Sequence, residues 1–277
     1  MPYFASLGYP CVALSLQGTG GTPALPEGAK KVKVDNHVRD LDAFLRGLSD
    51  ARSDNTNSKY SGLGLGLGEN PKVVLIGHSF GGLTIMKWLE TFYGEENNAE
   101  KESGIDLAGV AFLCSVPPSG NGPMTLRYLF RSFSDSWKIT AGFAMKKAIN
   151  DKDLCRTLFF GGIEDDNGIA DEDVERYQSY FARDTVATID LADLASKLPS
   201  LMADKQSGKA PFVEMLQSKS LVMGASDDFI VDREGLEETA KYMGLESPVI
   251  VESPHDIMIG KKWKNGADAI FDWVQKL

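Results

Sequence analysis

The sequence has few cysteines and no long apolar run. Its three cysteines, Cys11, Cys114 and Cys155, cannot build a disulfide framework, and no pair has the spacing of metal ligands. We therefore expect a reducing compartment, either cytoplasmic or the interior of an organelle such as a plastid, and Cys11 and Cys114 as small core residues within strands. No apolar stretch approaches the ~20 residues of a membrane span, and the first thirty residues lack the pattern of a secretory signal.

Basic residues are in the minority. The 29 lysines and arginines are outnumbered by 39 aspartates and glutamates, so the formal net charge is −10. A nucleic acid partner requires a basic surface that releases counterions, and anionic lipid head groups attract basic segments. We therefore expect neither of these partners and no transmembrane segment. A small-molecule or lipid ester is compatible with this charge, and the oligomeric state is left open.

What the sequence does contain is an alternation of predicted strands and helices. Short apolar runs predict strands, and three-four periodicity predicts helices. The strands are expected at 11–16, 73–76, 107–113, 220–223 and 249–251, and the helices at 2–7, 33–48, 81–92, 233–243 and 265–277. This alternation predicts an α/β fold with a mostly parallel sheet between helices. Residues 51–70 are polar and then rich in glycine and leucine, which predicts a surface loop.

Residues 121–200 interrupt the alternation. They contain four helical stretches, at 126–133, 139–149, 171–181 and 185–197, and no clear strand. We therefore divide the chain into an α/β core, 1–120 and 201–277, and a helical cap, 121–200. The aromatic residues of the cap are interpreted either as the wall of an acyl pocket or as packing between cap and core: Phe130, Phe133, Trp137, Phe143, Phe159 and Phe160.

The strongest motif is the stretch Gly77–Gly82 (GHSFGG), between a predicted buried strand and a predicted helix. A serine at the tip of such a turn has its hydroxyl exposed. Glycines two residues before and after it, Gly77 and Gly81, are expected because a side chain there would collide with the neighbouring backbone. The N–H of Phe80 lies at a helix start and could donate to an oxyanion. Ser79 is thus the candidate nucleophile; the alternative is a serine that only caps the helix.

A serine nucleophile needs a base, and the sequence has three histidines. His37 lies in a charged amphipathic segment and is expected on the solvated surface. His78 belongs to the motif itself and is expected to serve in packing or support. His255 follows the last predicted strand, where open α/β sheets build their sites. His255 is the candidate base; an ordinary surface-loop histidine is the alternative.

The third member of such a site is an acid that follows a strand and precedes the base in chain order. Asp227 and Asp228 come after the strand at 220–223. We predict Asp227, with Asp228 as the alternative, and the role is to orient the imidazole and stabilise its protonated form. In the remaining interpretation both aspartates only cap the following helix.

These three candidates, in this order and with a helical block before the acid, resemble the α/β-hydrolase superfamily. Tyr3–Tyr9 (YFASLGY), Leu16–Gly20 (LQGTG) and Pro254–Asp256 (PHD) are similar to stretches of its plant and bacterial lysophospholipase-like and esterase-like members. The resemblance implies an α/β-hydrolase fold, and hydrolysis of carboxylic esters through an acyl-serine without a metal or organic cofactor. The serine at position 79 is unlike the dehalogenase and epoxide-hydrolase branches, which have aspartate there.

The same resemblance implies that N-terminal strands of the sheet are missing. In the family, a strand ending in a His-Gly loop supplies a second oxyanion donor, and the sequence contains no His-Gly. That strand would lie between the strands at 11–16 and 73–76, so these two are expected either to pair directly or to leave the sheet marginal. Loss of one oxyanion donor costs about 10²–10³ in turnover. We expect a slow esterase at best; the alternative is a ligand-binding, receptor-like or inactive protein of this fold.

Overall fold

The fold is built around a parallel sheet, which we describe from a computed structural model. The structure describes residues 1–50, 72–93, 106–132, 134, 137–139, 141, 146–161 and 169–277. The four sheet strands are β2 (Lys72–His78), β3 (Asp106–Leu113), β5 (Ser220–Asp227) and β6 (Val249–Pro254), in the order β2-β3-β5-β6. His78 pairs with Leu113, and Leu113 with Met223, so the strands end at one edge of the sheet. The motif at Gly77–Gly82 lies at that edge, where β2 ends.

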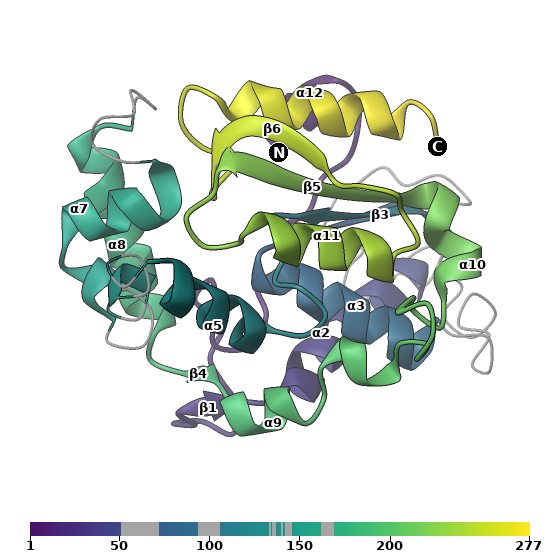
Figure 1. Cartoon of the computed structure of the whole chain (residues 1–277), viewed down its shortest axis with the longest axis horizontal. Helices are drawn as coiled ribbons and strands as arrows, with labels where there is room; N and C mark the ends of the chain where they lie inside the picture. Colours follow the sequence, from purple (N-terminus) through teal and green to yellow (C-terminus); the bar gives the residue numbers. More distant parts are fainter. Residues whose placement is uncertain are drawn as a thin grey trace.

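Helices cover both faces of this sheet (Figure 1). Helix α12 (Trp263–Val274) lies along one face with the short α1 (Pro2–Ser6), whose Tyr3 hydroxyl donates to Asp268 at 2.9 Å. The other face carries α2 (Val34–Asp50), α3 (Phe80–Phe92) and α11 (Arg233–Tyr242). These layers confirm the α/β fold expected from the alternation of apolar periods.

The predicted strand at 11–16 is wrong. No strand forms there, Val12 and Leu14 are 40% and 37% exposed, and Cys11 lies in irregular chain. A strand needs a neighbour to satisfy its backbone groups. Among the described strands, β2 pairs only with β3, so no strand lies beside its other edge and the two segments do not pair with each other. The apolar side chain of Ile76 in β2 is accordingly 44% exposed.

The segment 121–200 is mainly helical, beyond the end of the sheet at which its strands terminate (Figure 1). Its longer helices are α5 (Asn121–Arg131) and α8 (Asp171–Asp184). Shorter ones are η2 (Lys147–Ile149), α7 (Lys152–Cys155), the π-helical η3 (Arg156–Phe160), α9 (Leu191–Ala195) and η4 (Pro199–Met202). The expectation of a strand-free segment is wrong in one detail, because β4 (Thr188–Ile189) pairs with β1 (Lys31–Val32). The chain then returns to the sheet at β5 through α10 (Val213–Leu216) and η5 (Gln217–Lys219).

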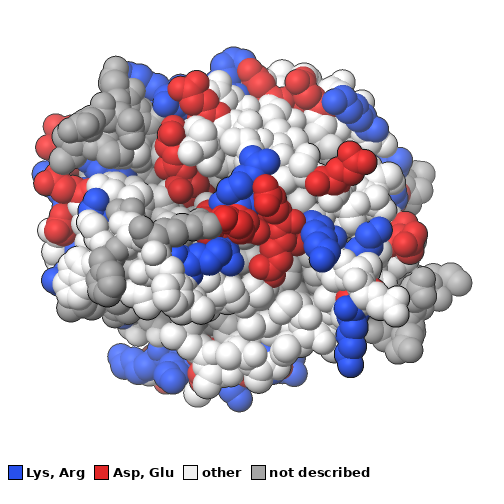
Figure 2. Space-filling model, in the orientation of Figure 1, with Lys and Arg blue, Asp and Glu red and all other residues white. Residues whose placement is uncertain are grey.

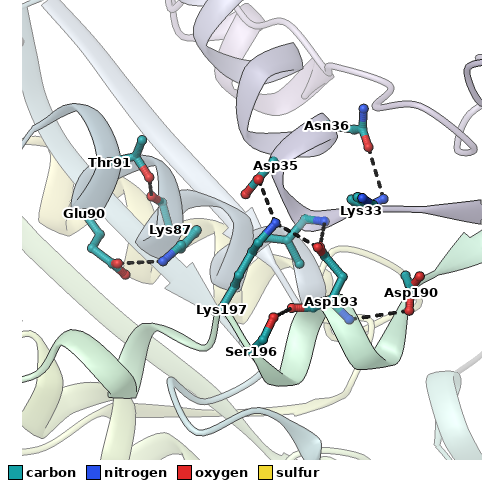
Figure 3. A network of polar contacts seen from close by, with 11 residues as sticks. Lys33, Asp35, Asn36, Lys87, Glu90, Thr91, Asp190, Asp193, Ser196 and Lys197 are labelled. Carbon is teal, nitrogen blue, oxygen red and sulfur yellow. Dashed lines mark hydrogen bonds and ion pairs between the residues drawn. The ribbon is translucent and has the colours of Figure 1, made fainter.

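A polar network fastens this segment to helix α2 (Figure 3). The ammonium group of Lys197 lies 2.6 Å from a carboxylate oxygen of Asp35 and 2.7 Å from one of Asp193. Asp193 in α9 also accepts the N–H of Val34, the first residue of α2, at 2.9 Å. A second anchor is the two-pronged ion pair between Arg127 of α5 and Asp232, with both contacts at 2.6 Å. These contacts help attach the segment to the sheet layers.

The expectation that His37 is solvated is wrong. Its side chain is buried, its Nε2 donates to the carbonyl oxygen of Gln17 at 2.9 Å, and its ring lies 6.0 Å from that of Phe80. The polar neighbours of His37 in the sequence concealed its position on the helix. It lies three residues after Val34 and four before Leu41, on the apolar stripe of α2.

Charges are intermingled over the face shown in Figure 2, where acidic and basic side chains lie side by side at the centre of the view. Some oppositely charged side chains pair within one helix, such as Arg233 and Glu237 in α11, at 2.8 Å. In the part of the chain that the structure describes, no helix is long and apolar enough to cross a bilayer. The predicted surface loop at 51–70, like Phe133 and Phe143, lies outside the described residues.

Candidate active site

The turn between β2 and α3 holds Ser79 in a strained conformation. Its φ of 52° and ψ of −121° are rare for a residue with a side chain and cost ~1–3 kcal/mol. The main chain is fixed on two sides, because the Ser79 N–H donates to Leu113 at 3.0 Å and its carbonyl accepts from Val116 at 3.1 Å. The Ser79 side chain makes no capping hydrogen bond to α3. The alternative of a serine that only caps the helix is therefore not what the geometry supports.

Two glycines allow this turn, but they are not the pair we predicted. A Cβ at Gly77 would come within 2.6 Å of the Gly82 backbone, as expected for a close approach of strand and helix. A Cβ at Gly81 would meet nothing within 4 Å. At Gly82, in contrast, it would overlap the hydroxyl of Ser115. The steric requirement after the serine therefore belongs to Gly82, and the expectation for Gly81 is wrong.

Phe80 is the first residue of α3, and its N–H has no acceptor among the described residues. A free N–H at a helix start, with the helix dipole behind it, is suited to an anion beside Ser79. The oxyanion role of Phe80 stays a prediction.

The candidate base His255 follows β6 directly and is only 2% exposed. Its Nδ1 lies 2.9 Å from each carboxylate oxygen of Asp228. Asp228 is held in turn, because its Oδ1 accepts the N–H groups of Ile230 at 2.8 Å and Val231 at 2.9 Å. A carboxylate fixed in this way sets both the ring orientation and the tautomer of the imidazole, leaving Nε2 for a proton acceptor role.

The structure brings Asp228, and not the predicted Asp227, to the base. Asp227 is the last residue of β5, where it pairs in register with Pro254, and it is exposed. Its nearest charged partner is Lys262, at 3.7 Å. Asp228 is the next residue, at the point where the chain leaves the strand and turns inward. The choice between the two adjacent acids was thus wrong, and the alternative acid is the one in place.

Neither acid caps the following helix. The N-cap of α11 is Asp232, whose side chain accepts the N–H of Gly235 at 3.0 Å. The interpretation of Asp227 and Asp228 as simple caps is therefore wrong as well.

The electrostatics of the pair favour a charged couple. Burial alone lowers the pKa of His255, but the charge of Asp228 and its hydrogen bond outweigh burial, and the pKa of His255 is raised. Burial raises the pKa of Asp228, but the charge and hydrogen bond of His255 and two backbone N–H groups bring it below its ordinary value. A proton taken up at His255 is thus stabilised where a serine base needs it.

His78 connects the turn to the base. Its ring centroid lies 4.8 Å from that of His255, and its Nε2 donates to the His255 carbonyl at 2.9 Å. The same nitrogen is 3.6 Å from a carboxylate oxygen of Asp256. The supporting position expected for His78 agrees with these contacts, which also place the base loop against the turn that carries Ser79.

Segment 121–200 contacts the candidate base through an aromatic side chain. The ring of Phe159 lies 6.3 Å from that of His255, and the Phe159 carbonyl accepts the N–H of Asp256 at 2.9 Å. Phe159 stacks with Phe181 at 4.8 Å between ring centroids, and Phe160 packs on Tyr177 at 5.2 Å. Two other predicted cap aromatics point to solvent instead, since Phe130 is 81% and Trp137 58% exposed.

Sequence reasoning missed Cys114, which it treated as an ordinary core residue. Cys114 follows β3, is fully buried, and has a positive φ of 44°. Its sulfur, an Asp228 oxygen and a His255 nitrogen all lie within 4.8 Å of one another. Burial, followed by the charge of Asp228, raises the pKa of this thiol, so it is protonated. The sequence feature that could have placed Cys114 near the site is its position at the end of a predicted strand.

Two groups of side chains have the spacing of metal ligands among the described residues: His78, His255 and Asp256, and Cys114, Asp228 and His255. Both groups include His255. In each, ring nitrogens already take part in hydrogen bonds, from His255 to Asp228 and from His78 to a carbonyl. A metal would have to displace these bonds and would occupy the base itself. The hydrogen-bonded couple is the chemistry that the arrangement supports.

Comparisons with known proteins identify structures of the same fold. Three solved structures share the fold at low sequence identity. A bromoperoxidase-like protein, BpoC of Mycobacterium tuberculosis H37Rv, has a TM-score of 0.55 and 13% identity, covering 99% of this chain and 84% of its own. Polyneuridine aldehyde esterase has 0.53 and 15%, covering 98% and 90%. A hydrolase from Oleispira antarctica, olei00960, has 0.51 and 12%, covering 93% and 78%.

No curated protein is similar enough in sequence to match the chain. The model of the alpha/beta hydrolase family, however, matches residues 1–259. The matched range includes Ser79, Asp228 and His255. The chain belongs to the alpha/beta hydrolase family.

Proposed function

We propose that this hydrolase-family chain is a serine esterase that cleaves carboxylic esters of small molecules or lipids. The observation that carries the proposal is the buried His255–Asp228 couple, with both contacts at 2.9 Å, on a loop held against the turn of Ser79. A carboxylate–imidazole couple beside a strained serine is the arrangement that acyl transfer requires.

The reaction has two steps. His255 Nε2 accepts the Ser79 proton as the hydroxyl oxygen attacks the ester carbonyl, and the tetrahedral oxyanion accepts the N–H of Phe80. His255 then gives its proton to the departing alcohol, which leaves an acyl-serine. In the second step His255 takes a proton from water, the water oxygen attacks the acyl group, and the proton returns to Ser79. Asp228 stabilises the imidazolium in both steps.

The aromatic group of the cap supports an apolar substrate. Phe159 lies beside the base and is half-buried, and Phe181 and Tyr177 extend the same cluster. Apolar surface beside a reacting ester favours an acyl or alcohol group that is itself apolar. We therefore extend the proposal to esters with an aliphatic or aromatic group, with residues 121–200 acting as the cap.

The test is covalent labelling with a fluorophosphonate, followed by turnover of p-nitrophenyl esters with acyl chains of increasing length. The wild-type chain is expected to take up one label, on Ser79, and to hydrolyse the esters over many turnovers. Ser79→Ala is expected to lose both. The matched control Ser226→Ala removes an exposed serine at the end of another strand, β5, and is expected to retain both.

The outcomes separate the alternatives. A label on Ser79 with a single burst of alcohol and no further turnover favours the ligand-binding interpretation. Equal labelling of the wild-type chain and Ser79→Ala contradicts the nucleophile itself.

A further inference from the structure

The hydrogen bond from His78 joins the two halves of the proposed site. His78 immediately precedes Ser79, and its Nε2 donates to the carbonyl of His255, the proposed base, at 2.9 Å. The same carbonyl accepts the N–H of Ile257, also at 2.9 Å. One hydrogen bond therefore links the residue next to the nucleophile with the main chain of the base.

This bond fixes a distance that the sheet alone leaves free. Ser79 is positioned by β2 and β3, whereas His255 is on a loop that follows β6, at the other end of the strand order. The side chain of Asp228 restrains the imidazole through Nδ1, but it does not restrain the distance between the loop and the serine turn. We propose that His78 is a positioning residue, holding the His255 main chain so that Nε2 meets the Ser79 hydroxyl. The inference rests on the proposed function.

The contact requires His78 in one tautomer. A carbonyl oxygen only accepts, so the proton of neutral His78 must be on Nε2. The titratable groups that face His78 are His255, Asp256 and, further away, Asp228. Burial and the neighbouring His255 lower the pKa of His78, which keeps it neutral at neutral pH. A neutral donor is required here, because a positive charge 4.8 Å from the His255 ring would oppose the imidazolium that forms during acyl transfer.

Asp256 completes the arrangement. Its N–H donates to the carbonyl of Phe159 at 2.9 Å, so the base loop is held by His78 on one side and by the cap on the other. Its carboxylate lies 3.6 Å from the His78 nitrogen and adds to the field that raises the pKa of His255. The hydrogen bond of His78 thus ties the base loop directly to the serine turn.

The kinetic test compares two substitutions at this position. His78→Leu removes the donor, and His78→Gln keeps an N–H group at a similar reach without a titrating ring. A misplacement of about 1 Å can cost ~10²-fold in rate, so His78→Leu is expected to lower kcat by that order with little change in KM. His78→Gln is expected to recover most of the rate, with the apparent pKa of the acid limb unmoved.

A matched control separates positioning from folding. His37 makes the same bond, from Nε2 to a carbonyl at 2.9 Å, but its acceptor is Gln17, away from the base. Turnover is measured per site that reacts with a fluorophosphonate after long incubation. His37→Leu is expected to keep kcat per reactive site. Any loss caused by misfolding is expected to lower the number of reactive sites instead. His78→Leu is expected to keep its sites and lose kcat per site; a loss of sites at unchanged kcat per site overturns the inference.

A second measurement needs no substrate. The His255 Nδ1 proton, bonded to Asp228, is expected at low field in the imidazole NMR spectrum of the wild-type chain, and Asp228→Asn assigns it by its loss. If His78 holds the loop, this signal broadens in His78→Leu and stays sharp in His78→Gln. An unchanged signal in His78→Leu overturns the positioning role, even if the wild-type chain hydrolyses no ester. Absence of labelling in the wild-type chain instead contradicts the proposed function alone.

Discussion

Replacing the proposed acid Asp228 by asparagine is expected to abolish most of the proposed esterase activity while the chain stays folded. The carboxylate accepts from His255 Nδ1 at 2.9 Å, and the imidazolium charge is spread over a ring whose centre is ~4 Å away, where two unit charges interact by ~4 kcal/mol at an effective dielectric constant of 20. Loss of this attraction corresponds to about three powers of ten in rate. An amide also favours the wrong imidazole tautomer, and the combined loss in kcat is expected to be ~10⁴-fold.

The neighbouring acid provides the control for this experiment. Asp227→Asn is the same substitution one residue earlier, but Asp227 is exposed and its charged neighbour is Lys262, at 3.7 Å. Such surface pairs contribute little, so kcat is expected to stay within about threefold of wild type. The assay is p-nitrophenyl ester hydrolysis, with the folded fraction of each variant measured by near-ultraviolet circular dichroism. Similar rates for the two variants would refute the assignment of Asp228 as the acid.

Three further predictions concern the base, the serine turn and the cap. Since His255 acts when neutral and its pKa is raised, kcat/KM is expected to fall on the acid side with an apparent pKa above 6.5, the ordinary value for histidine, which a pH–rate profile measures. Gly77→Ala is expected to prevent folding or labelling, because its Cβ would lie 2.6 Å from backbone, whereas Gly81→Ala, with open space around it, is expected to label normally. Arg127→Ala breaks the two-pronged pair with Asp232, whose side chain is 5% exposed, and is expected to lower the free energy of unfolding by ~1.5–3 kcal/mol; an unchanged denaturation midpoint would contradict this anchoring role.

Periodicity and motif spacing predicted most of the sheet, but they could not separate the two adjacent acids. Both Asp227 and Asp228 lie at the end of an apolar run, and the difference depends on where pairing with β6 stops. Pairing continues to Asp227 opposite Pro254, so this side chain still follows the strand and points to solvent. The first residue after the pairing ends is free to turn toward the base. That end point is set by a neighbouring strand, which is remote in the sequence.

Two other errors have different causes. His37 was judged by its polar sequence neighbours, although its spacing from Val34 and Leu41 places it on the buried stripe of α2. The helical period was the better guide there. The apolar run at 11–16 has the composition of a strand, but composition does not supply a partner, and none of the described strands pairs with it. Local sequence patterns thus predicted the helices and strands that pair or pack, and failed where the structure depends on a segment remote in the sequence.

Ser79, the proposed nucleophile, follows the outermost strand of the sheet, since β2 pairs only with β3 among the described strands. Detaching an outermost strand breaks one ladder where an interior strand would break two, so it requires less free energy than melting the whole molecule. On warming, the proposed hydrolytic activity is therefore expected to be lost a few degrees below the temperature at which the helices melt. The upper temperature limit of the proposed activity would then depend on the fraying of a single strand, while the rest of the molecule is still folded.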